Sequence, residues 1–279
     1  MGIAYRMLGS RSDAEDVLQD AYVRWHQADI SSLKNPEAWL VTVVTRLSID
    51  RLRLAKAERE HYVGQWIPEP WITDHAPPAE QPIEMANDLS IAFLMMLERL
   101  APEERAAFLL KEAFDFDYEE ISQTMGKSLD ACRQMIHRAK LRMKQERPRF
   151  DVSRQAHIAL LGKFIAAARS GDREKLMALF AEDVTLTGDG GGKVLSVLRP
   201  LHGSERVTRL YQAIVKRLVG KMEFRIAEIN GIPGILRYVD GMLDSATSFV
   251  TDGARILDIY IVRNPEKLKS VTNPPSCPS

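Results

Sequence analysis

Residues 117–140, DYEEISQTMGKSLDACRQMIHRAK, constrain the fold more than any other stretch of this sequence. Asp117 and Glu120 have the spacing of a capping box, which predicts a short helix that ends at Gly126. Ser128 then caps a longer helix, whose inward-facing positions are Leu129, Cys132, Ile136, Ala139 and Met143. A short helix, a turn containing glycine and a longer helix follow one another as in a helix-turn-helix.

The charge along this part of the chain supports a DNA-binding motif. Residues 98–120 contain three basic and eight acidic side chains, whereas residues 127–147 contain seven basic and two acidic ones. The whole chain is neutral, with 38 basic and 38 acidic residues, so positive charge is concentrated on the longer helix, where phosphate contacts need it. Pattern and charge alone leave one alternative open, which is a pair of packed helices in an ordinary bundle.

Proline divides the chain into blocks. Five of the fourteen prolines fall between Pro68 and Pro82, where a helix does not persist, so residues 61–85 are predicted to be a Pro-rich linker. A second boundary is expected between Pro148 and Asp151. The prediction is a helical domain over residues 1–60, a second over 86–149, a third domain over 150–269 and a disordered tail over 270–279.

The blocks differ in their hydrophobic patterns. In the first, Ser12 and Glu15 have capping-box spacing ahead of a helix with Ala14, Val17, Leu18, Ala21, Tyr22 and Trp25 on one face. Asn35 caps a second helix there, with Pro36 in its first turn. The third block has helical patterns over residues 157–170, 173–180 and 204–219, and strand patterns over 184–187, 222–228, 234–239 with its continuation, and 254–262. This order predicts an α+β domain.

Composition limits the class of protein. Hydrophobic residues make up 45% and charged residues 27% of the 279 residues, which is typical of a globular protein. The two cysteines, Cys132 and Cys277, do not make a disulfide framework, and the six histidines lack metal-ligand spacing. No apolar run approaches the roughly 20 residues needed to cross a bilayer. We therefore expect a cytoplasmic protein with no membrane partner and no metal or other cofactor.

Several motifs resemble those of extracytoplasmic-function sigma factors of the sigma-70 family. Tyr5–Ser10, Asp13–Asp20 and Asn35–Leu40, followed by Arg46 and Asp50-Arg51, resemble their region two. Leu100–Arg105, Tyr118–Ile121 and Ile136–Ala139 resemble region four. Members usually carry a further helical segment ahead of this region two, so an N-terminally shortened region two is expected. The resemblance implies two all-α sigma domains.

Three further motifs resemble those of the SigJ-type subgroup, whose members carry a C-terminal SnoaL-like extension. They are Trp66-Ile-Pro-Glu-Pro70, Asp189-Gly-Gly-Gly-Lys193 and Asn264-Pro-Glu-Lys-Leu268, with Ile67 in place of the usual leucine and Glu266 in place of the usual aspartate. The resemblance implies a cone-shaped α+β domain that acts as a built-in regulator, so that no separate anti-sigma factor is expected. The implied regulatory interface comprises Trp66, Pro68, Glu69, Pro70, Asp189, Gly190, Gly191, Gly192, Lys193, Asn264, Pro265, Glu266, Lys267 and Leu268.

The family resemblance also implies the partners, which are promoter DNA and core RNA polymerase with its β′ and β subunits. Docking on β′ would use the polar face of the first long helix, with Asp16, Gln19, Asp20 and Arg24. Residues suited to DNA backbone or base contacts are Arg46, Arg51, Arg53, Lys56, Lys127, Ser128, Arg133, Gln134, His137, Arg138 and Lys140. Trp39 has the spacing of a core residue rather than of a stacking platform.

Two other functions stay open from the sequence. One is a one-component DNA-binding regulator whose third domain senses a ligand. The other is a SnoaL-like isomerase or cyclase, which needs a general base and an oxyanion partner in an apolar pocket. His202, Asp183, Asp240 and Tyr238 are the candidates for that chemistry, but no spacing pairs them. We therefore expect a sigma factor and not an enzyme.

Overall fold

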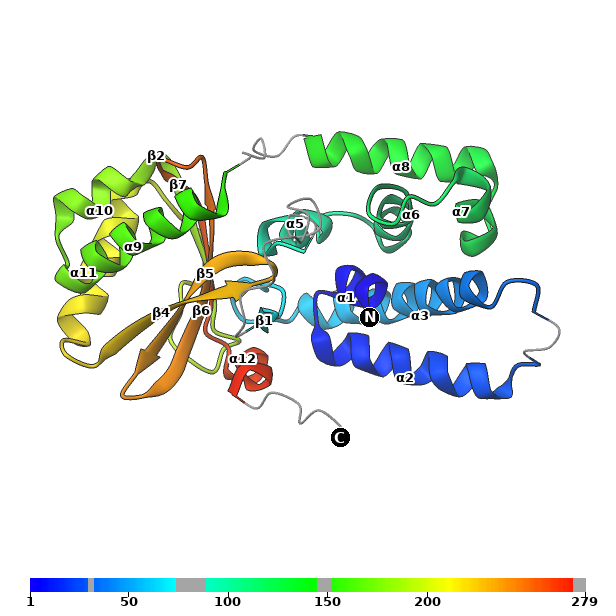
Figure 1. Ribbon diagram of the computed structural model, residues 1–279, viewed down its shortest axis with the longest axis horizontal. Coiled ribbons are helices and arrows are strands. Elements are labelled where there is room, and N and C mark those ends of the chain that lie inside the picture. Colours follow the sequence, from blue (N-terminus) through cyan, green and yellow to red (C-terminus); the bar gives the residue numbers. More distant parts are fainter. Residues whose placement is uncertain (30–32, 74–88, 145–151, 273–279) are drawn as a thin grey trace. The chain divides into compact units, whose positions relative to one another are not determined.

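The computed structural model describes residues 1–29, 33–73, 89–144 and 152–272, and these belong to two compact units (Figure 1). One, here called the helical unit, comprises Met1–His61 and Phe93–Pro148. The other, here called the C-terminal unit, comprises Tyr62–Ala92 and Arg149–Ser279. Both helical blocks of the sequence thus contribute to one unit, while residues 62–73 of the Pro-rich segment belong with the C-terminal unit. The expected linker residues 74–85 and residues 273–279 of the expected tail lie outside the described residues. Residues 270–272, which were expected to be disordered, instead end a helix over Pro265–Thr272.

The helical unit contains seven helices within the described residues. They are α1 (Gly2–Leu8), α2 (Arg11–Gln27), α3 (Pro36–Arg59), α5 (Ile91–Leu97), α6 (Pro102–Glu112), α7 (Tyr118–Met125) and α8 (Leu129–Lys144). Two predicted caps are confirmed: Asn35 Oδ1 accepts from the Ala38 amide at 3.1 Å, and Asp117 and Glu120 form the reciprocal capping box. The cap predicted at Ser12 is wrong, because Ser10 accepts from the Asp13 amide and begins α2 two residues earlier.

The core of the helical unit joins the two sequence blocks. Helix α1 packs against α2, α3 and α6, and its Tyr5, Met7 and Leu8 are buried. Val41 of α3 packs against a cluster of buried residues from α6, α7 and α8: Ala107, Leu110, Ile121, Cys132, Met135 and Ile136. The expected inward position of Tyr22 is wrong, because its side chain is exposed and meets the ring of His26 edge-on at 4.4 Å.

The described strands of the C-terminal unit form one seven-stranded sheet in the order β1-β4-β5-β6-β7-β2-β3. The strands are β1 (Ile72–Thr73), β2 (Phe180–Asp189), β3 (Leu201–His202), β4 (Met222–Ile229), β5 (Ile232–Val239), β6 (Met242–Thr251) and β7 (Ile256–Val262). Neighbours are antiparallel except β2 and β7, which run parallel. Strand β1 comes from the Pro-rich segment, so that segment extends the sheet.

Helices α9 (Arg154–Ser170), α10 (Arg173–Leu179) and α11 (Ser204–Arg217) pack against this sheet, and α12 (Pro265–Thr272) follows β7 (Figure 1). The expected α+β architecture is confirmed. Aromatic rings fill the space between helices and sheet: Phe164 lies 5.1 Å from both Tyr211 and Phe249, measured between ring centroids. No helix in the described part of the chain is long and apolar enough to span a membrane.

Candidate functional site

Helix α8 presents a polar face away from its core side. Gly126, with φ of 62°, ends α7 in the left-handed conformation, and Ser128 Oγ accepts from the Ala131 amide at 3.3 Å at the start of α8. Cys132 and Ile136 are buried, and the predicted DNA-facing side chains on the opposite side are exposed: Lys127, Ser128, Arg133, Gln134, His137 and Arg138. The geometry therefore leaves this helix face open to a ligand.

Acidic residues of α6 hold part of the basic charge of α8. Glu104 Oε1 lies 3.2 Å from Arg138 Nε, and its Oε2 lies 2.5 Å from Arg142 Nη1. Half-buried Lys140 pairs with Glu112 at 2.7 Å. These pairs orient the basic side chains along α8, but they also compete with any phosphate that approaches the same guanidinium groups.

Two of the predicted DNA-binding residues of α3 bind main-chain oxygens of the second helical block. Arg46 donates to the main-chain oxygens of Thr124 at 3.0 Å and Gln123 at 3.3 Å. Both carbonyls belong to the last turn of α7, where the helix dipole favours a cation. Lys56 Nζ donates to the Leu100 carbonyl at 2.6 Å. These two cations are therefore already bound to backbone oxygens within the helical unit.

Carboxylates engage the other two predicted cations of α3. Arg53 pairs with Asp50 at 2.8 Å and with Glu103 at the start of α6. Arg51 pairs with Asp13 at 2.8 Å and with Glu58 at 3.1 Å. In this arrangement the predicted DNA-binding side chains of α3 all have intramolecular partners.

A buried ion network ties the two helical blocks together next to these pairs. Glu98 bonds to Arg59 of α3, and its Oε1 accepts from Arg105 Nη1 at 2.6 Å. Burial favours the neutral form of Glu98, but the guanidinium groups of Arg105 and Arg59 outweigh it and hold the pKa of this carboxyl below its usual value. Arg105 also donates to the Met7 carbonyl at 2.8 Å, so the network reaches α1.

The polar face of α2 is exposed as the sequence predicted. Asp16, Gln19, Asp20 and Arg24 are all exposed. Tyr22 and Val23 are exposed as well, with 62% and 48% of their surface accessible.

In the C-terminal unit, the buried carboxylate of Asp189 gathers the three motifs of the sequence. Its Oδ1 accepts from the Tyr62 hydroxyl at 2.6 Å and from the Gly191 amide at 3.0 Å. Its Oδ2 accepts from the Ile67 amide at 3.0 Å and from Lys267 Nζ at 2.7 Å. The side chain of Asp189 is fully buried, so this carboxylate bonds residues 62–67, the glycine turn and α12 without competition from water.

Lys267 is the cation of this centre. Its ammonium donates to the Ile67 carbonyl at 2.5 Å and lies 4.2 Å from the centroid of the Trp66 ring. Asn264 Nδ2 donates to the Tyr62 hydroxyl at 2.9 Å. Burial, followed by the hydrogen bond to Asp189, raises the pKa of Tyr62, so its hydroxyl keeps its proton and remains a donor.

The glycines of residues 190–192 allow a close approach in this centre. Gly191 has φ of 60°, and a Cβ there would overlap the side-chain amide of Asn264. A Cβ on Gly190 would lie 2.5 Å from the Val194 carbonyl oxygen. At the exposed rim, Lys193 pairs with Glu266. The remaining predicted interface residues Pro68, Glu69, Pro70 and Leu268 are buried, while Pro265 is exposed.

Some residues of this centre were not predicted from the sequence. Tyr62 lies four positions before the Trp66 motif, and only its proximity to that motif pointed to it. Asp244 pairs with Arg237 and with Arg263, both at 2.5 Å, and Arg263 also donates to the Leu195 carbonyl beyond the glycine turn. Nothing in the local sequence pattern links these residues, because they lie on β5, β6 and the segment after β7.

The candidates for enzyme chemistry are not brought together. His202 lies on the edge strand β3, where its Nδ1 is 3.3 Å from Thr185 Oγ1, while Tyr238 lies on β5, four strands away in the sheet. Asp240 is exposed in the turn after β5, where it lies 3.6 Å from Lys221. Asp183 is exposed on β2. The described residues contain no cluster of histidine, cysteine or acidic side chains that could hold a metal ion.

Comparisons with known proteins agree with both units. Residues 1–58 match the family model for sigma-70 region 2, and residues 90–143 match that for sigma-70, region 4. The chain is 34% identical over 280 residues to the ECF RNA polymerase sigma factor SigJ of Mycobacterium tuberculosis, covering 96% of this chain and 89% of that protein. It is 28% identical to the probable ECF RNA polymerase sigma factor SigI of the same organism, covering 95% and 90%. The crystal structure of M. tuberculosis SigJ matches with a TM-score of 0.78 at 33% identity, covering 99% of this chain and 96% of that one.

Proposed function

Because this chain belongs to the extracytoplasmic-function sigma factors of the sigma-70 family, which support promoter-specific transcription initiation, we propose which of its residues perform each step. Residues 1–60 act as region two, residues 86–149 as region four, and the C-terminal unit regulates both in cis, in the cytoplasm. The observation that carries this proposal is the Asp189 centre, where one buried carboxylate holds the segment that connects the two sigma regions.

Promoter recognition is assigned to α8. Arg133 and Gln134 lie on its exposed face near the N-terminal end, where arginine and glutamine make paired hydrogen bonds to purine edges in the major groove. His137 and Arg138 continue that face. Lys127, Ser128 and Lys140 bind backbone phosphates, with the Ser128 end of α8 offering main-chain amides.

Contacts of α3 with DNA require a change within the helical unit. Arg46 and Lys56 bind carbonyls of the second block, and Arg53 binds Glu103 of α6. Arg51 pairs within the first block. We infer that regions two and four separate when core polymerase binds, which exchanges these partners for phosphates. The exposed face with Asp16, Gln19, Asp20 and Arg24 docks on the β′ subunit.

Regulation is assigned to the segment from Tyr62 to Thr73. This segment bonds to Asp189, Lys267 and Asn230 and adds β1 to the sheet. Its position along the chain, between regions two and four, limits how far the two regions can separate while it stays docked. The C-terminal unit therefore takes the role that a separate anti-sigma protein has elsewhere.

The test is promoter-directed transcription with purified core polymerase. We compare the wild-type chain with Asp189→Asn, which removes the buried charge, and with Glu182→Gln, which removes one charge from an exposed position of the same strand β2. Transcription that depends on the added chain supports the sigma function. A changed output with Asp189→Asn that circular dichroism shows to be folded, but not with Glu182→Gln, supports regulation by the centre.

The two parts of the proposal fail separately. Absence of initiation and of core-polymerase binding by the wild-type chain contradicts the assigned roles of α2, α3 and α8. Equal output from all three chains leaves the sigma function intact but removes the regulatory role of Asp189. An output that falls only when a second protein is added assigns regulation to that protein instead.

A further inference from the structure

Helix α11 carries a line of basic side chains on the side that faces away from the core. Residues 204–221 contain five basic side chains and one acidic one, Glu205. Val207, Thr208 and Tyr211 face the core and are buried. The exposed basic residues, here called the α11 basic stripe, are Arg206, Arg209, Lys216, Arg217 and, just beyond the helix, Lys221.

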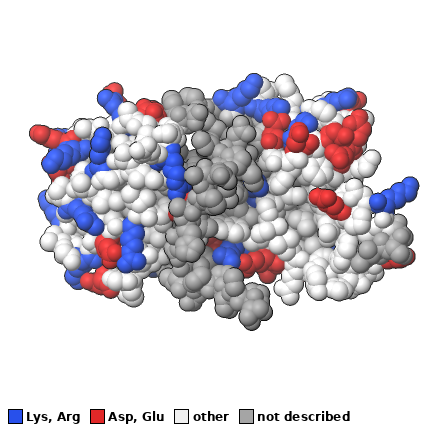
Figure 2. Space-filling model, in the orientation of Figure 1, with Lys and Arg blue, Asp and Glu red and all other residues white. Residues whose placement is uncertain are grey.

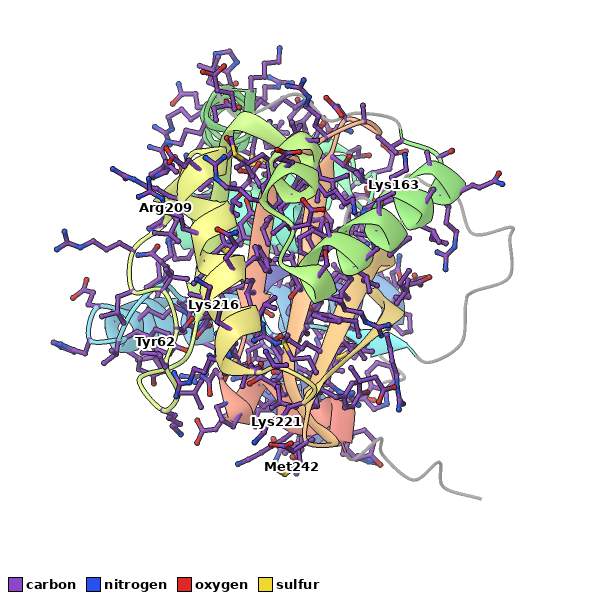
Figure 3. The ribbon with its side chains drawn as sticks, turned by 90° about the vertical axis from the view of Figure 1, so that its left-hand side faces the viewer. Tyr62, Lys163, Arg209, Lys216, Lys221 and Met242 are labelled. Carbon is purple, nitrogen blue, oxygen red and sulfur yellow. The ribbon has the colours of Figure 1, made fainter. Side chains whose placement is uncertain are left out.

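Helical spacing puts these side chains on one side of α11. Arg209 and Lys216 are seven positions apart, about two turns, and Arg206 and Arg217 are eleven apart, about three turns. Arg209, Lys216 and Lys221 follow the length of the helix in Figure 3. Other lysine and arginine side chains of the C-terminal unit are visible on its surface in Figure 2.

Much of this charge is not neutralised within the chain. Among the described residues, Arg206, Lys216 and Arg217 form no ion pair, and neither does the exposed Lys163 of α9. Glu205 pairs with Arg209 at 2.5 Å and lies 3.8 Å from Arg173, and Lys221 lies 3.6 Å from Asp240. The other acids of these helices are Asp172, which pairs with Lys175, and Glu174. The stripe therefore keeps a net positive charge.

The strands that follow α11 along the chain have the opposite balance. Residues 222–262, which contain β4 to β7, hold three basic and six acidic side chains. Positive charge is thus concentrated on α11 and negative charge on the strands that follow it. A polyanion is therefore attracted to the helix and repelled near those strands.

From this segregation we propose that the α11 basic stripe binds the backbone phosphates of duplex DNA. A helix of 14 residues is about 21 Å long, which spans several consecutive phosphates. Lysine and arginine spaced along such a helix, without an aromatic platform among them, suit backbone contacts rather than base readout. DNA is the polyanion that the sigma regions already bring to this chain, so the stripe adds sequence-independent affinity from the C-terminal unit.

The test measures the salt dependence of binding of the full chain to a short duplex of random sequence. The variant is Arg206→Gln with Lys216→Gln, which breaks no ion pair of the described residues. The control is Arg225→Gln with Arg255→Gln, which removes the same formal charge from exposed positions on β4 and before β7 and also breaks the exposed pair of Arg225 with Glu223. Circular dichroism checks that both variants fold.

We expect the slope of log K against log salt concentration to become shallower by up to about 2 in the stripe variant, because up to two phosphate contacts are lost. The control keeps the wild-type slope. Equal slopes for all three chains overturn the proposal. So does stripe-dependent sedimentation with phosphatidylserine vesicles while duplex binding stays unchanged, since the stripe would then face a membrane. Neither result depends on the regulatory role of Asp189, which is tested by transcription.

A second measurement locates the contact directly. Ala213 is exposed in the middle of the stripe, so a photo-crosslinking amino acid placed there in the full chain should crosslink to promoter DNA in the complex with polymerase. The same probe at Ile226, exposed on β4, should not. A crosslink from position 213 only to a polymerase subunit would overturn the proposal.

Discussion

Replacing Asp189 with asparagine tests the buried centre of the C-terminal unit. The asparagine has the same volume, but its amide group turns one of the two acceptor oxygens into a donor. That donor would face either the pair of Tyr62 and Gly191 or the pair of Ile67 and Lys267, all of which now donate. The substitution also leaves the Lys267 ammonium, whose side chain is 12% exposed, without its carboxylate.

The magnitude follows from these contacts. Breaking a buried ion pair by removing one partner costs about 3–5 kcal/mol, because an uncompensated charge stays buried. We therefore expect Asp189→Asn to lower the free energy of unfolding by about that amount. Lys267→Met removes the stranded cation, so the double variant should be more stable than the sum of the two single effects predicts, by about 2 kcal/mol.

The assay is urea unfolding followed by tryptophan fluorescence, since Trp66 lies against the Lys267 ammonium. Lys193→Met is the control: it breaks the exposed pair with Glu266 in the same motifs, and water screening makes its effect small. Strictly additive single effects would contradict the predicted coupling between Asp189 and Lys267. If Asp189→Asn alone fails to fold, a folded double variant would still show the coupling. If the double variant is unfolded while Lys267→Met alone is stable, the coupling is contradicted.

Three further outcomes are expected. Burial, helped by Arg154, lowers the pKa of His157 to about 4, so its contribution to stability is present above pH 6.5 and is lost as pH falls toward 4. Between pH 7 and 5 the wild type should lose about 2 kcal/mol more unfolding free energy than His157→Gln does. Equal losses for the two proteins in urea titrations would contradict this. Arg133→Ala should weaken binding to a cognate promoter fragment by about 1–3 kcal/mol and relax base preference, whereas an unchanged preference in a binding assay removes that residue from base readout. Gly191→Ala should lower the melting temperature more than Gly220→Ala, because both positions have positive φ but only the first also meets a side chain; equal shifts would show that the overlap is relieved.

Local signals identified much of the helical unit. The caps at Asn35 and Asp117 and the turn at Gly126 depend on residues within about four positions of one another. Local spacing was therefore enough to predict these helix ends. The exposed face of α8 followed from helical periodicity in the same way. Periodicity was less reliable at Tyr22, because an apolar side chain is often left on a surface.

Two of the α3 cations have partners that left no signal in the sequence. Arg46 and Lys56 bind main-chain carbonyls, which every residue carries, so no residue type marks the contact. Basic side chains of a helix can bind phosphates, but the same side chains can bind the carbonyl groups at the C-terminal end of another helix.

Neighbours along the chain sufficed to predict the long helices, several strands of the third block, the segment where positive charge gathers and the motifs, but not the short strand β1 in the Pro-rich segment. Folding of the whole unit was needed to show that Asp189 bonds to Ile67, 122 positions earlier, and to Lys267, 78 positions later. It also decided that the segment from Tyr62 to Thr73 joins the C-terminal sheet. The physical reason is that a buried charge is stable only when distant parts of the chain supply its hydrogen-bond partners, and packing of the whole unit brings those parts together.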